Sequence, residues 1–570
     1  MKILLAALDS KFIHANLALR YLKKYCSGFD IEIKEFTINQ KQEYILGEIL
    51  DADADLVCFS CYIWNIDYIN DISYVLKEAK NKAGILYGGP EVSFEVKKMM
   101  EDKPFIDYII FGEGEETFKE FLEEIQNPDP KLHKIKGLAF KENNEIIINQ
   151  GRELIENLDI ISYPYEEDDD FENKIIYYES SRGCPFCCSF CMSSIDKKMR
   201  FFSMERVKKD LKMLLNTKAK QIKFVDRTFN ADYRRSMEII QYIVENNKSN
   251  MTIHFEITAD IINDEFVNFI GKMPVNMFQF EMGVQSLNED TLFEINRHMD
   301  KGRFTRVVSE IGKNRNVHMH LDLIAGLPYE DFESFKKSFD GIHSLNAEKI
   351  QLGFLKVLKG TKIYKDIEKH RIKYTKKPPY EVISTKYMSL ENLLMLKNIE
   401  ELVDKYYNEK YFSNSLKYII NNLFPESAFE FYSSFSVYWK GNDLYNKAHS
   451  RKDLYKILYD YIKYSNRMKD EFIQALKFDY IFNNQYEELP DYLNRESEDK
   501  FKNIKRLLAN DREFKNNYFS SMEGKIINDF RIAEIGENNI LFVYRDKENI
   551  FNRCETYVVN NIGEIGNEKR

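Results

Sequence analysis

Four of the eight cysteines of this 570-residue chain lie close together, at positions 184–191. Read from Cys184, the thiols of Cys188 and Cys191 have the spacing C-x3-C-x2-C, which leaves Cys187 outside the pattern. Three nearby thiolates on one loop can bind three irons of a 4Fe-4S cluster, and the missing fourth ligand leaves one iron open to a small molecule. These three cysteines are therefore the catalytic and metal-binding candidates.

Two other arrangements of the same thiols are open. Cys184-x2-Cys187 followed directly by Cys188-x2-Cys191 could form a structural zinc site, but the two pairs lack the long spacer that lets such pairs face one metal. A disulfide is disfavoured because nothing marks the chain as secreted. A cluster with an open iron is the favoured interpretation.

The loop resembles that of the radical S-adenosylmethionine (SAM) enzymes, in which an aromatic residue, here Phe190, precedes the last cysteine. The resemblance implies that Cys184, Cys188 and Cys191 hold a 4Fe-4S cluster whose open iron chelates the amino and carboxylate groups of SAM. One electron from the cluster would cleave SAM to a 5'-deoxyadenosyl radical. The resemblance also implies a low-potential electron donor of the flavodoxin or ferredoxin type as a partner.

Bulk composition indicates a soluble protein of roughly three to four domains, with 44% apolar and 31% charged residues. The formal net charge of -10 argues against a general nucleic-acid or anionic-membrane partner, because binding to phosphates needs a basic face. The apolar run at residues 3–8 is too short for a signal peptide, and no apolar window is long enough to span a membrane. With eight cysteines and no export signal, we expect the reducing cytoplasm.

The first predicted domain, residues 1–135, alternates short apolar runs with amphipathic stretches. Five strand-helix units predict a doubly wound, Rossmann-like α/β domain with a parallel sheet, whose ligands lie beyond the carboxyl ends of the strands. The expected strands are residues 3–8, 31–36, 56–62, 84–87 and 108–111, and the expected helices are residues 17–25, 44–50, 69–79, 92–100 and 115–125.

The strand ends of this domain carry paired glycines, which let a backbone approach a bulky ligand closely. As a set, these ends resemble the cobalamin-binding domain that precedes the barrel in one class of radical SAM enzymes, and the order of domains matches. The resemblance implies cobalamin as a third cofactor. The residues that would contact it are Ser60 and Tyr62 after the third strand, Gly88, Gly89 and Glu91 after the fourth, and Gly112, Glu113 and Gly114 after the fifth.

His14 follows the first strand, where other cobalamin proteins carry an Asp-x-His-x-x-Gly signature. This chain keeps only the histidine, without the aspartate that would orient the imidazole. The interpretation of His14 as a polar residue near the start of the first helix is therefore favoured over its interpretation as a cobalt ligand.

Cys58 and Cys61 form a further C-x2-C pair. On a strand their side chains point to opposite faces, so we expect both to be core or pocket-wall residues.

Residues 136–172 are expected to form a linker with a hairpin around Asn143 and Asn144, followed by an exposed acidic run at residues 166–170.

In residues 173–365 short apolar strands again alternate with amphipathic helices. Six such strand-helix units predict a partial (β/α)6 barrel with active residues at the carboxyl ends of its strands.

The barrel's strand ends resemble those of the cobalamin-type radical SAM group. The resemblance implies that Glu256, Gln285 and Ser286 face the ribose or methionine part of SAM, and that the backbone near Phe190 borders the adenine. An ion pair inside the barrel mouth is an equal alternative for Glu256 and for Asp226. No phosphate-binding loop or dinucleotide fingerprint is present.

The remaining residues, 366–570, predict a mostly helical accessory domain that ends in a small antiparallel sheet at residues 526–559. Its aromatic residues between Tyr406 and Trp439 are expected to form helical core rather than a binding surface. A subgroup of the cobalamin-type radical SAM enzymes resembles the chain in this extension as well.

The resemblance favours methyl transfer to an unactivated carbon or to phosphorus. Radical rearrangement or cyclisation assisted by cobalamin is the alternative within enzymes. A cobalamin-binding sensor or carrier whose cluster only detects oxygen or iron is the alternative of another class, and an open iron argues against it. The substrate, a small molecule or a peptide, is not specified by the residues.

Overall fold

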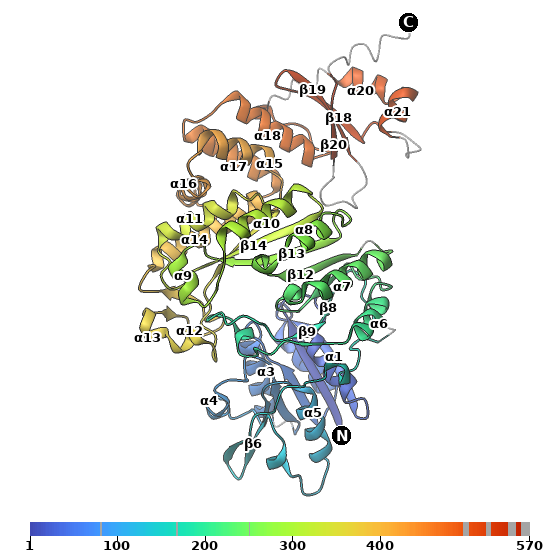
Figure 1. Cartoon of the computed structure of the whole chain (residues 1–570), viewed down its shortest axis with the longest axis vertical. Coiled ribbons are helices and arrows are strands. Elements are labelled where there is room, and N and C mark those ends of the chain that lie inside the picture. Colours follow the sequence, from blue (N-terminus) through green and yellow to red (C-terminus); the bar gives the residue numbers. More distant parts are fainter. Residues whose placement is uncertain are drawn as a thin grey trace. The chain divides into compact units, whose positions relative to one another are not determined.

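The computed structural model describes residues 1–79, 82–166, 169–249, 251–493, 501–519, 526–544 and 554–559. The chain divides into two compact units, one of residues 1–331 with 353–390 and the other of residues 332–352 with 391–570. The first unit contains two large sheets, which Figure 1 shows in blue and in green.

The first sheet confirms the predicted doubly wound domain. Its order is β2-β1-β3-β4-β5-β6-β7, and β1 to β5 run parallel. Helix α4 begins later than expected because Glu95, directly before it, has a left-handed φ of 55°. The elements are β1 (Lys2–Asp9), α1 (Leu17–Tyr25), β2 (Asp30–Thr37), α2 (Gln42–Asp51), β3 (Leu56–Ser60), α3 (Ile66–Glu78), β4 (Gly84–Gly88), α4 (Val96–Asp102), β5 (Tyr108–Ile110) and α5 (Glu115–Glu124).

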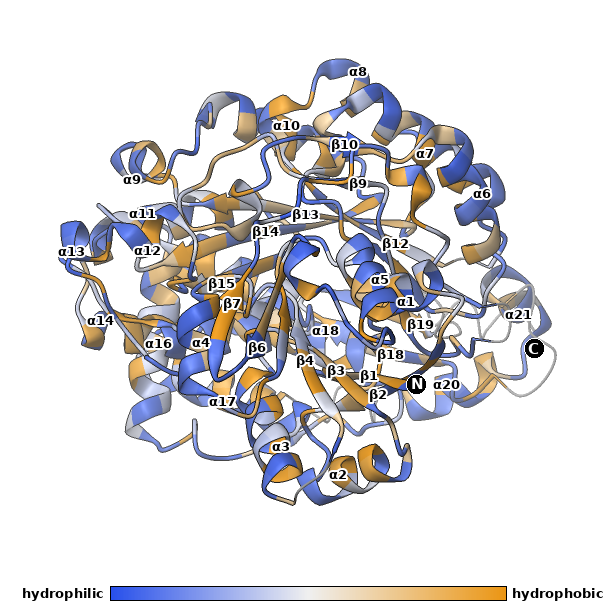
Figure 2. Ribbon diagram, turned by 90° about the horizontal axis from the view of Figure 1, so that it is seen from below, coloured by the Kyte–Doolittle hydropathy of each residue, from blue (hydrophilic) through white to orange (hydrophobic). Residues whose placement is uncertain are grey.

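Both faces of this sheet are covered, as its near-continuous apolar strands require. In β1, Leu4, Ala6 and Leu8 enter one buried cluster while Ile3 and Leu5 enter the other. Figure 2 shows the hydrophobic strands inside and hydrophilic residues on the outer sides of the helices.

The predicted hairpin forms, but it extends the first sheet instead of standing in a linker. β6 (Leu138–Glu142) pairs antiparallel with β5 and with β7 (Glu145–Ile148), and Asn143 and Asn144 adopt the positive φ that a tight hairpin turn needs. The acidic run is not a free connection, because Asp169 forms an ion pair with Arg20 at 2.8 Å; its residues 167–168 lie outside the described residues.

The second sheet has the order β15-β14-β13-β12-β11-β8, with parallel pairing from β8 to β14. Its six strands confirm the predicted partial barrel. The elements are β8 (Ile175–Tyr178), β9 (Ser181–Arg182), β10 (Arg200–Phe201), α6 (Met204–Leu214), β11 (Gln221–Phe224), α7 (Tyr233–Asn246), β12 (Thr252–Ile257), α8 (Asp264–Ile270), β13 (Phe278–Gln285), α9 (Glu289–Glu294), α10 (Lys301–Lys313), β14 (Val317–Ala325), α11 (Phe332–His343) and β15 (Lys349–Phe354).

The second unit is mostly helical, and the aromatic run forms its interior: Phe431, Tyr432, Phe435 and Trp439 are fully buried. None of its described helices, nor any in the described part of the first unit, is long and apolar enough to cross a membrane. The larger elements are α14 (Leu390–Leu402), α15 (Ser413–Tyr418), α16 (Ala428–Gly441), α17 (Arg451–Tyr464), α18 (Asp470–Asn483) and the antiparallel strands β18 (Phe530–Ile535), β19 (Asn538–Tyr544) and β20 (Cys554–Val558).

Candidate functional site

A cavity of about 620 Å³ lies at the carboxyl ends of β1, β3, β4 and β5. One part of its wall comes from the first sheet, as the sequence predicts for a ligand site. Residues of α1, among them Leu17 and Tyr21, also line it, and a further part comes from the barrel, from the ends of β8 and β11. The barrel residues that line the cavity are Tyr177, Glu179, Arg182, Val225 and Arg227.

Six of the predicted cobalamin contacts line this cavity: Ser60, Tyr62, Gly88, Gly89, Gly112 and Gly114. A Cβ atom at Gly89, where φ is +113°, would lie 2.6 Å from the carbonyl oxygen of Cys61, so only glycine fits. At Gly112 no atom lies within 4 Å of the position a Cβ would take. The wall is thus open backbone, which suits a wide planar ligand.

The two glutamates of the same loops point elsewhere and do not line the cavity. The Glu91 carboxylate accepts a hydrogen bond from the Tyr380 hydroxyl and lies 3.9 Å from the Lys359 ammonium. Glu91 thereby connects its loop to the segment that follows the barrel. The Glu113 carboxylate is directed toward two arginines, described below.

Two polar pairs at the cavity were not anticipated. His14 Nδ1 lies 2.7 Å from the Tyr177 hydroxyl, and burial lowers the pKa of His14 and raises that of Tyr177 to about 12. Asp9 lies beside Asn16 at the end of β1, and burial together with the charge of Glu35 raises the pKa of Asp9 to about 7. The cavity therefore holds one carboxyl group, that of Asp9, whose protonation can change near neutral pH.

The cysteine loop lies between β9 and β10, which pair antiparallel and close its two ends. Cys184 and Cys188 are buried, Cys191 is half-buried and Cys187 is exposed. Burial raises the pKa of Cys188, nearby Cys191 and Cys184 raise it further, and Arg297, whose Nη1 lies 3.9 Å from the Cys188 sulfur, lowers it. Three thiols of the predicted register therefore lie near one another, and the fourth faces solvent.

The segment entering this loop is fixed to β11. The buried Asp226 carboxylate accepts hydrogen bonds from the Ser180 amide at 2.9 Å, from the Ser180 hydroxyl at 2.7 Å and from the Ser181 hydroxyl. The two alternatives for Asp226 were an ion pair in the barrel mouth and direct contact with SAM, and its carboxylate is instead hydrogen-bonded to these two serines. Its side chain anchors the backbone that leads to Cys184.

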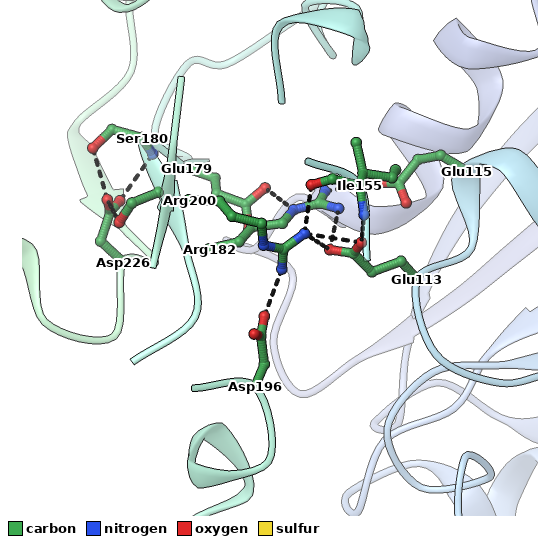
Figure 3. A network of polar contacts seen from close by, with 10 residues as sticks. Glu113, Glu115, Ile155, Glu179, Ser180, Arg182, Asp196, Arg200 and Asp226 are labelled. Carbon is green, nitrogen blue, oxygen red and sulfur yellow. Dashed lines mark hydrogen bonds and ion pairs between the residues drawn. The ribbon is translucent and has the colours of Figure 1, made fainter. Parts of the chain in front are cut away.

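A charged network surrounds the loop (Figure 3). Arg182 donates to Glu179, Glu113 and Glu115, and Arg200 donates to Glu113 and Asp196. Burial would raise the pKa of Glu115, but Arg182 holds it below its usual range. The two arginines and Glu115 were not assigned roles from sequence. The signal was present as an arginine directly before Gly183-Cys184 and acidic residues that alternate with glycines at 112–115.

The predicted SAM contacts have different surroundings. Glu256 is half-buried on β12, and burial raises its pKa while Arg227 lowers it. Gln285, at the end of β13, has a left-handed φ of 71° and a buried Oε1 atom without a hydrogen-bond partner. Ser286 is fully buried and its hydroxyl donates to Glu330 at 2.7 Å. Phe190 is half-buried.

These residues fit the three cofactors that the sequence implies. Three thiols near one another suit an iron-sulfur cluster with one open iron. The glycine-edged cavity suits cobalamin, and the unpartnered Gln285 oxygen is a buried acceptor that a bound donor would satisfy.

Three protein families match consecutive parts of the chain. The family described as "B12 binding domain" matches residues 3–122, and "Radical SAM superfamily" matches residues 178–342. A family described as "Protein of unknown function (DUF4080)" matches residues 368–549.

Among curated proteins, an uncharacterized methyltransferase of Pyrococcus horikoshii is 26% identical over 63% of this chain and 78% of its own length. The 2-(S-pantetheinyl)-carbapenam-3-carboxylate methyltransferase of Streptantibioticus cattleyicolor is 23% identical over 56% of this chain, which spans only 49% of that relative.

Among solved structures, the cobalamin-dependent SAM radical enzyme OxsB with aqua-cobalamin bound aligns with a TM-score of 0.59 at 15% identity, covering 88% of this chain and 81% of that one. This likeness supports the fold. Together with the cysteine loop and the glycine-edged cavity, these matches identify a B12-binding domain followed by a radical SAM domain and a DUF4080 region, the first two in the order found in cobalamin-binding radical SAM enzymes.

Proposed function

We propose that this protein is a cobalamin-dependent radical SAM methyltransferase that acts on an unactivated carbon or on phosphorus of a small molecule. When bound, the cluster supplies the electron that cleaves SAM and cobalamin supplies the methyl group. The names of the two curated relatives support methyl transfer.

One observation carries the proposal: a single cavity has walls from both halves of the first unit. Gly88 and Gly112 border it on the side of the first sheet, and Arg182 and Arg227 on the side of the barrel. The three cysteines do not line the cavity themselves, but Arg182 and Gly183 connect its wall to Cys184, so we infer that the substrate lies where the cavity meets the cysteine loop. Holding reactants in one such site converts separate encounters into a single positioned reaction.

The residues divide into direct contacts and supports. We assign cluster binding to Cys184, Cys188 and Cys191, and contacts with SAM to Glu256, Gln285 and the backbone near Phe190. The glycines with Ser60 and Tyr62 border cobalamin, and Tyr62 stacks on Trp64 with ring centroids 4.3 Å apart. Ser286 and Glu91 are assigned supporting roles, because their side chains already form hydrogen bonds within the protein. The Ser286 hydroxyl donates to Glu330, and the Glu91 carboxylate accepts from Tyr380.

The reaction needs an electron from outside the chain. We infer a low-potential donor of the flavodoxin or ferredoxin type and a cytoplasmic setting, in which all eight thiols stay reduced. We propose that residues 1–135, together with the hairpin of β6 and β7 that extends their sheet, serve cobalamin, and that the rest of residues 136–172 forms the connection. Residues 173–365 would serve the cluster and SAM, and residues 366–570 would have an accessory role.

Anaerobic incubation of the iron-loaded protein with SAM and a strong reductant tests the proposal. We expect 5'-deoxyadenosine from the native protein and none from Cys188→Ala, which removes one iron ligand. A protein that holds its cluster and yet forms no 5'-deoxyadenosine would be a sensor or carrier, and the proposed function would be wrong.

A further inference from the structure

Two arginines stand at opposite ends of the cysteine loop and share one carboxylate. Arg182, on β9, donates to Glu113 at 3.1 Å, and Arg200, on β10, donates to both oxygens of the same carboxylate at 2.9 and 3.0 Å. Figure 3 shows both guanidinium groups directed at Glu113. Glu113 itself belongs to the first sheet's loop, not to the barrel.

This network is buried, so its members depend on one another. The side chain of Arg200 is 2% exposed, and those of Arg182 and Glu113 are 13% and 15% exposed. Arg182 also donates to the buried Glu115 at 2.6 Å, a second carboxylate from the first domain. Because a buried charge that loses its partner is strongly unfavourable, moving Glu113 must also move or destabilise the arginines.

At one end, the network borders the cobalamin cavity. Gly112 and Gly114, the residues on either side of Glu113, both line that cavity, as does Glu115. A ligand pressed against these glycines fixes the backbone from which the Glu113 side chain extends. The position of the carboxylate therefore reports whether the cavity is filled.

At the other end, the network borders the backbone of the first cluster cysteine. Arg200 holds the Asp196 carboxylate, and the Asp196 carbonyl accepts the amide hydrogen of Cys184 at 3.1 Å. Gly183, which links Arg182 to Cys184, has a φ of +89° and packs against the carbonyl of Lys198. Both ends of the loop thus depend on the two arginines.

We propose that Glu113 is a positioning residue through which the cobalamin loop and the cluster loop hold each other, so that each cofactor tightens binding of the other. The inference rests on the proposed function, since it needs both cofactors to bind where we assign them. Such coupling is reciprocal: if the cluster raises the affinity for cobalamin, cobalamin raises retention of the cluster by the same factor.

The test measures binding without turnover. The dissociation constant of hydroxocobalamin is determined anaerobically for the iron-free chain and for the same chain with its cluster reconstituted. We expect the cluster to tighten binding about tenfold, within the usual range of such coupling. In the converse experiment, saturating hydroxocobalamin should slow the loss of iron to a chelator.

Glu113→Gln keeps the size of the side chain and removes the shared charge, and it should reduce the effect of the cluster to less than about twofold. Glu116→Gln is the matched control, because Glu116 lies in the same segment but pairs with Arg152 instead of Arg182 or Arg200. It should keep the full effect.

The native chain alone can overturn the inference, even if Glu113→Gln does not fold. Hydroxocobalamin affinity that is equal with and without the cluster overturns it, and so does coupling that survives in folded Glu113→Gln. In either case, binding of both cofactors leaves the proposed function standing. A chain that binds neither iron nor cobalamin overturns the proposed function and this inference together.

Discussion

Two regions of the first unit carry cysteines with two residues between them, and only one of these regions brings thiols together. In β3, Cys58 belongs to the buried cluster on one face of the sheet, and Cys61, just past the strand, belongs to the cluster on the other face. In the loop between β9 and β10, Cys184, Cys188 and Cys191 lie close enough for the charges of two to affect the third.

The difference shows that the backbone, rather than the spacing, decides what a cysteine pair can do. A strand sends alternate side chains to opposite faces, whereas a loop can fold its side chains toward one point. Burial raises the pKa of Cys58 and Cys61 far above the usual range, so both stay protonated and inert. In the loop, burial raises the pKa of Cys188 as well, but Arg297, which follows α9, lies beside its sulfur and opposes that rise.

The largest effect should come from exchanging the loop thiols for alanine. Cys188→Ala should lose the 4Fe-4S absorbance after anaerobic reconstitution and all formation of 5'-deoxyadenosine. The exposed Cys187 and the core residue Cys58 are controls, and their alanine variants should keep both signals. Equal loss of iron from the Cys187 and Cys188 variants would show that the ligand register is wrong.

The next effect concerns the glycine beside each cysteine region. Gly183 and Gly89 both have positive φ and pack against a backbone carbonyl, so alanine at either position is strained by about 1–3 kcal/mol. Gly183→Ala should lower the iron content, and Gly89→Ala should weaken hydroxocobalamin binding at least several-fold. Iron content and hydroxocobalamin binding are measured on both variants. The assignment would be contradicted if Gly89→Ala lost iron while Gly183→Ala lost hydroxocobalamin binding.

A smaller effect should depend on pH. Because the pKa of Asp9 is raised to about 7, the native state keeps a proton that the unfolded state loses between about pH 4 and 7. Asp9 therefore destabilises the native state increasingly as pH rises through that window. Asp9→Asn should raise the melting temperature by a few degrees at about pH 8 and much less at about pH 5.

Asp71→Asn, on the exposed side of α3, is the control and should change the melting temperature equally at both pH values. If Asp9→Asn raised the melting temperature equally at the two pH values, the pKa of Asp9 would not be raised in the native state.

The smallest change is expected at His14. The sequence lacks the aspartate that would orient this imidazole, and in the structure its Nδ1 is paired with Tyr177. The electron paramagnetic resonance spectrum of bound cobalt(II) cobalamin should therefore show no nitrogen splitting and should be unchanged in His14→Ala. A nitrogen triplet that disappears in His14→Ala would identify His14 as the cobalt ligand.

Sequence reasoning predicted most of the fold because both sheets repeat a strand-helix pattern with clear hydrophobic periodicity. It also predicted the edge glycines, since loops after parallel strands meet at one edge. It did not find Arg182 and Arg200 as partners of Glu113, because they are 69 and 87 residues away and the pairing depends on how two domains pack. It also placed the hairpin in a linker, because the pairing of β6 with β5 across residues 111–137 is not visible in the local pattern.

The central claim is that one cavity serves methyl transfer and radical chemistry together. Once a substrate is found, the most direct test is a product count with SAM labelled in its methyl group. We predict that each labelled product forms with roughly one S-adenosylhomocysteine, left when the methyl group passes to cobalamin, and roughly one 5'-deoxyadenosine. Product formed with 5'-deoxyadenosine but with neither label nor S-adenosylhomocysteine would contradict methyl transfer and establish rearrangement or cyclisation.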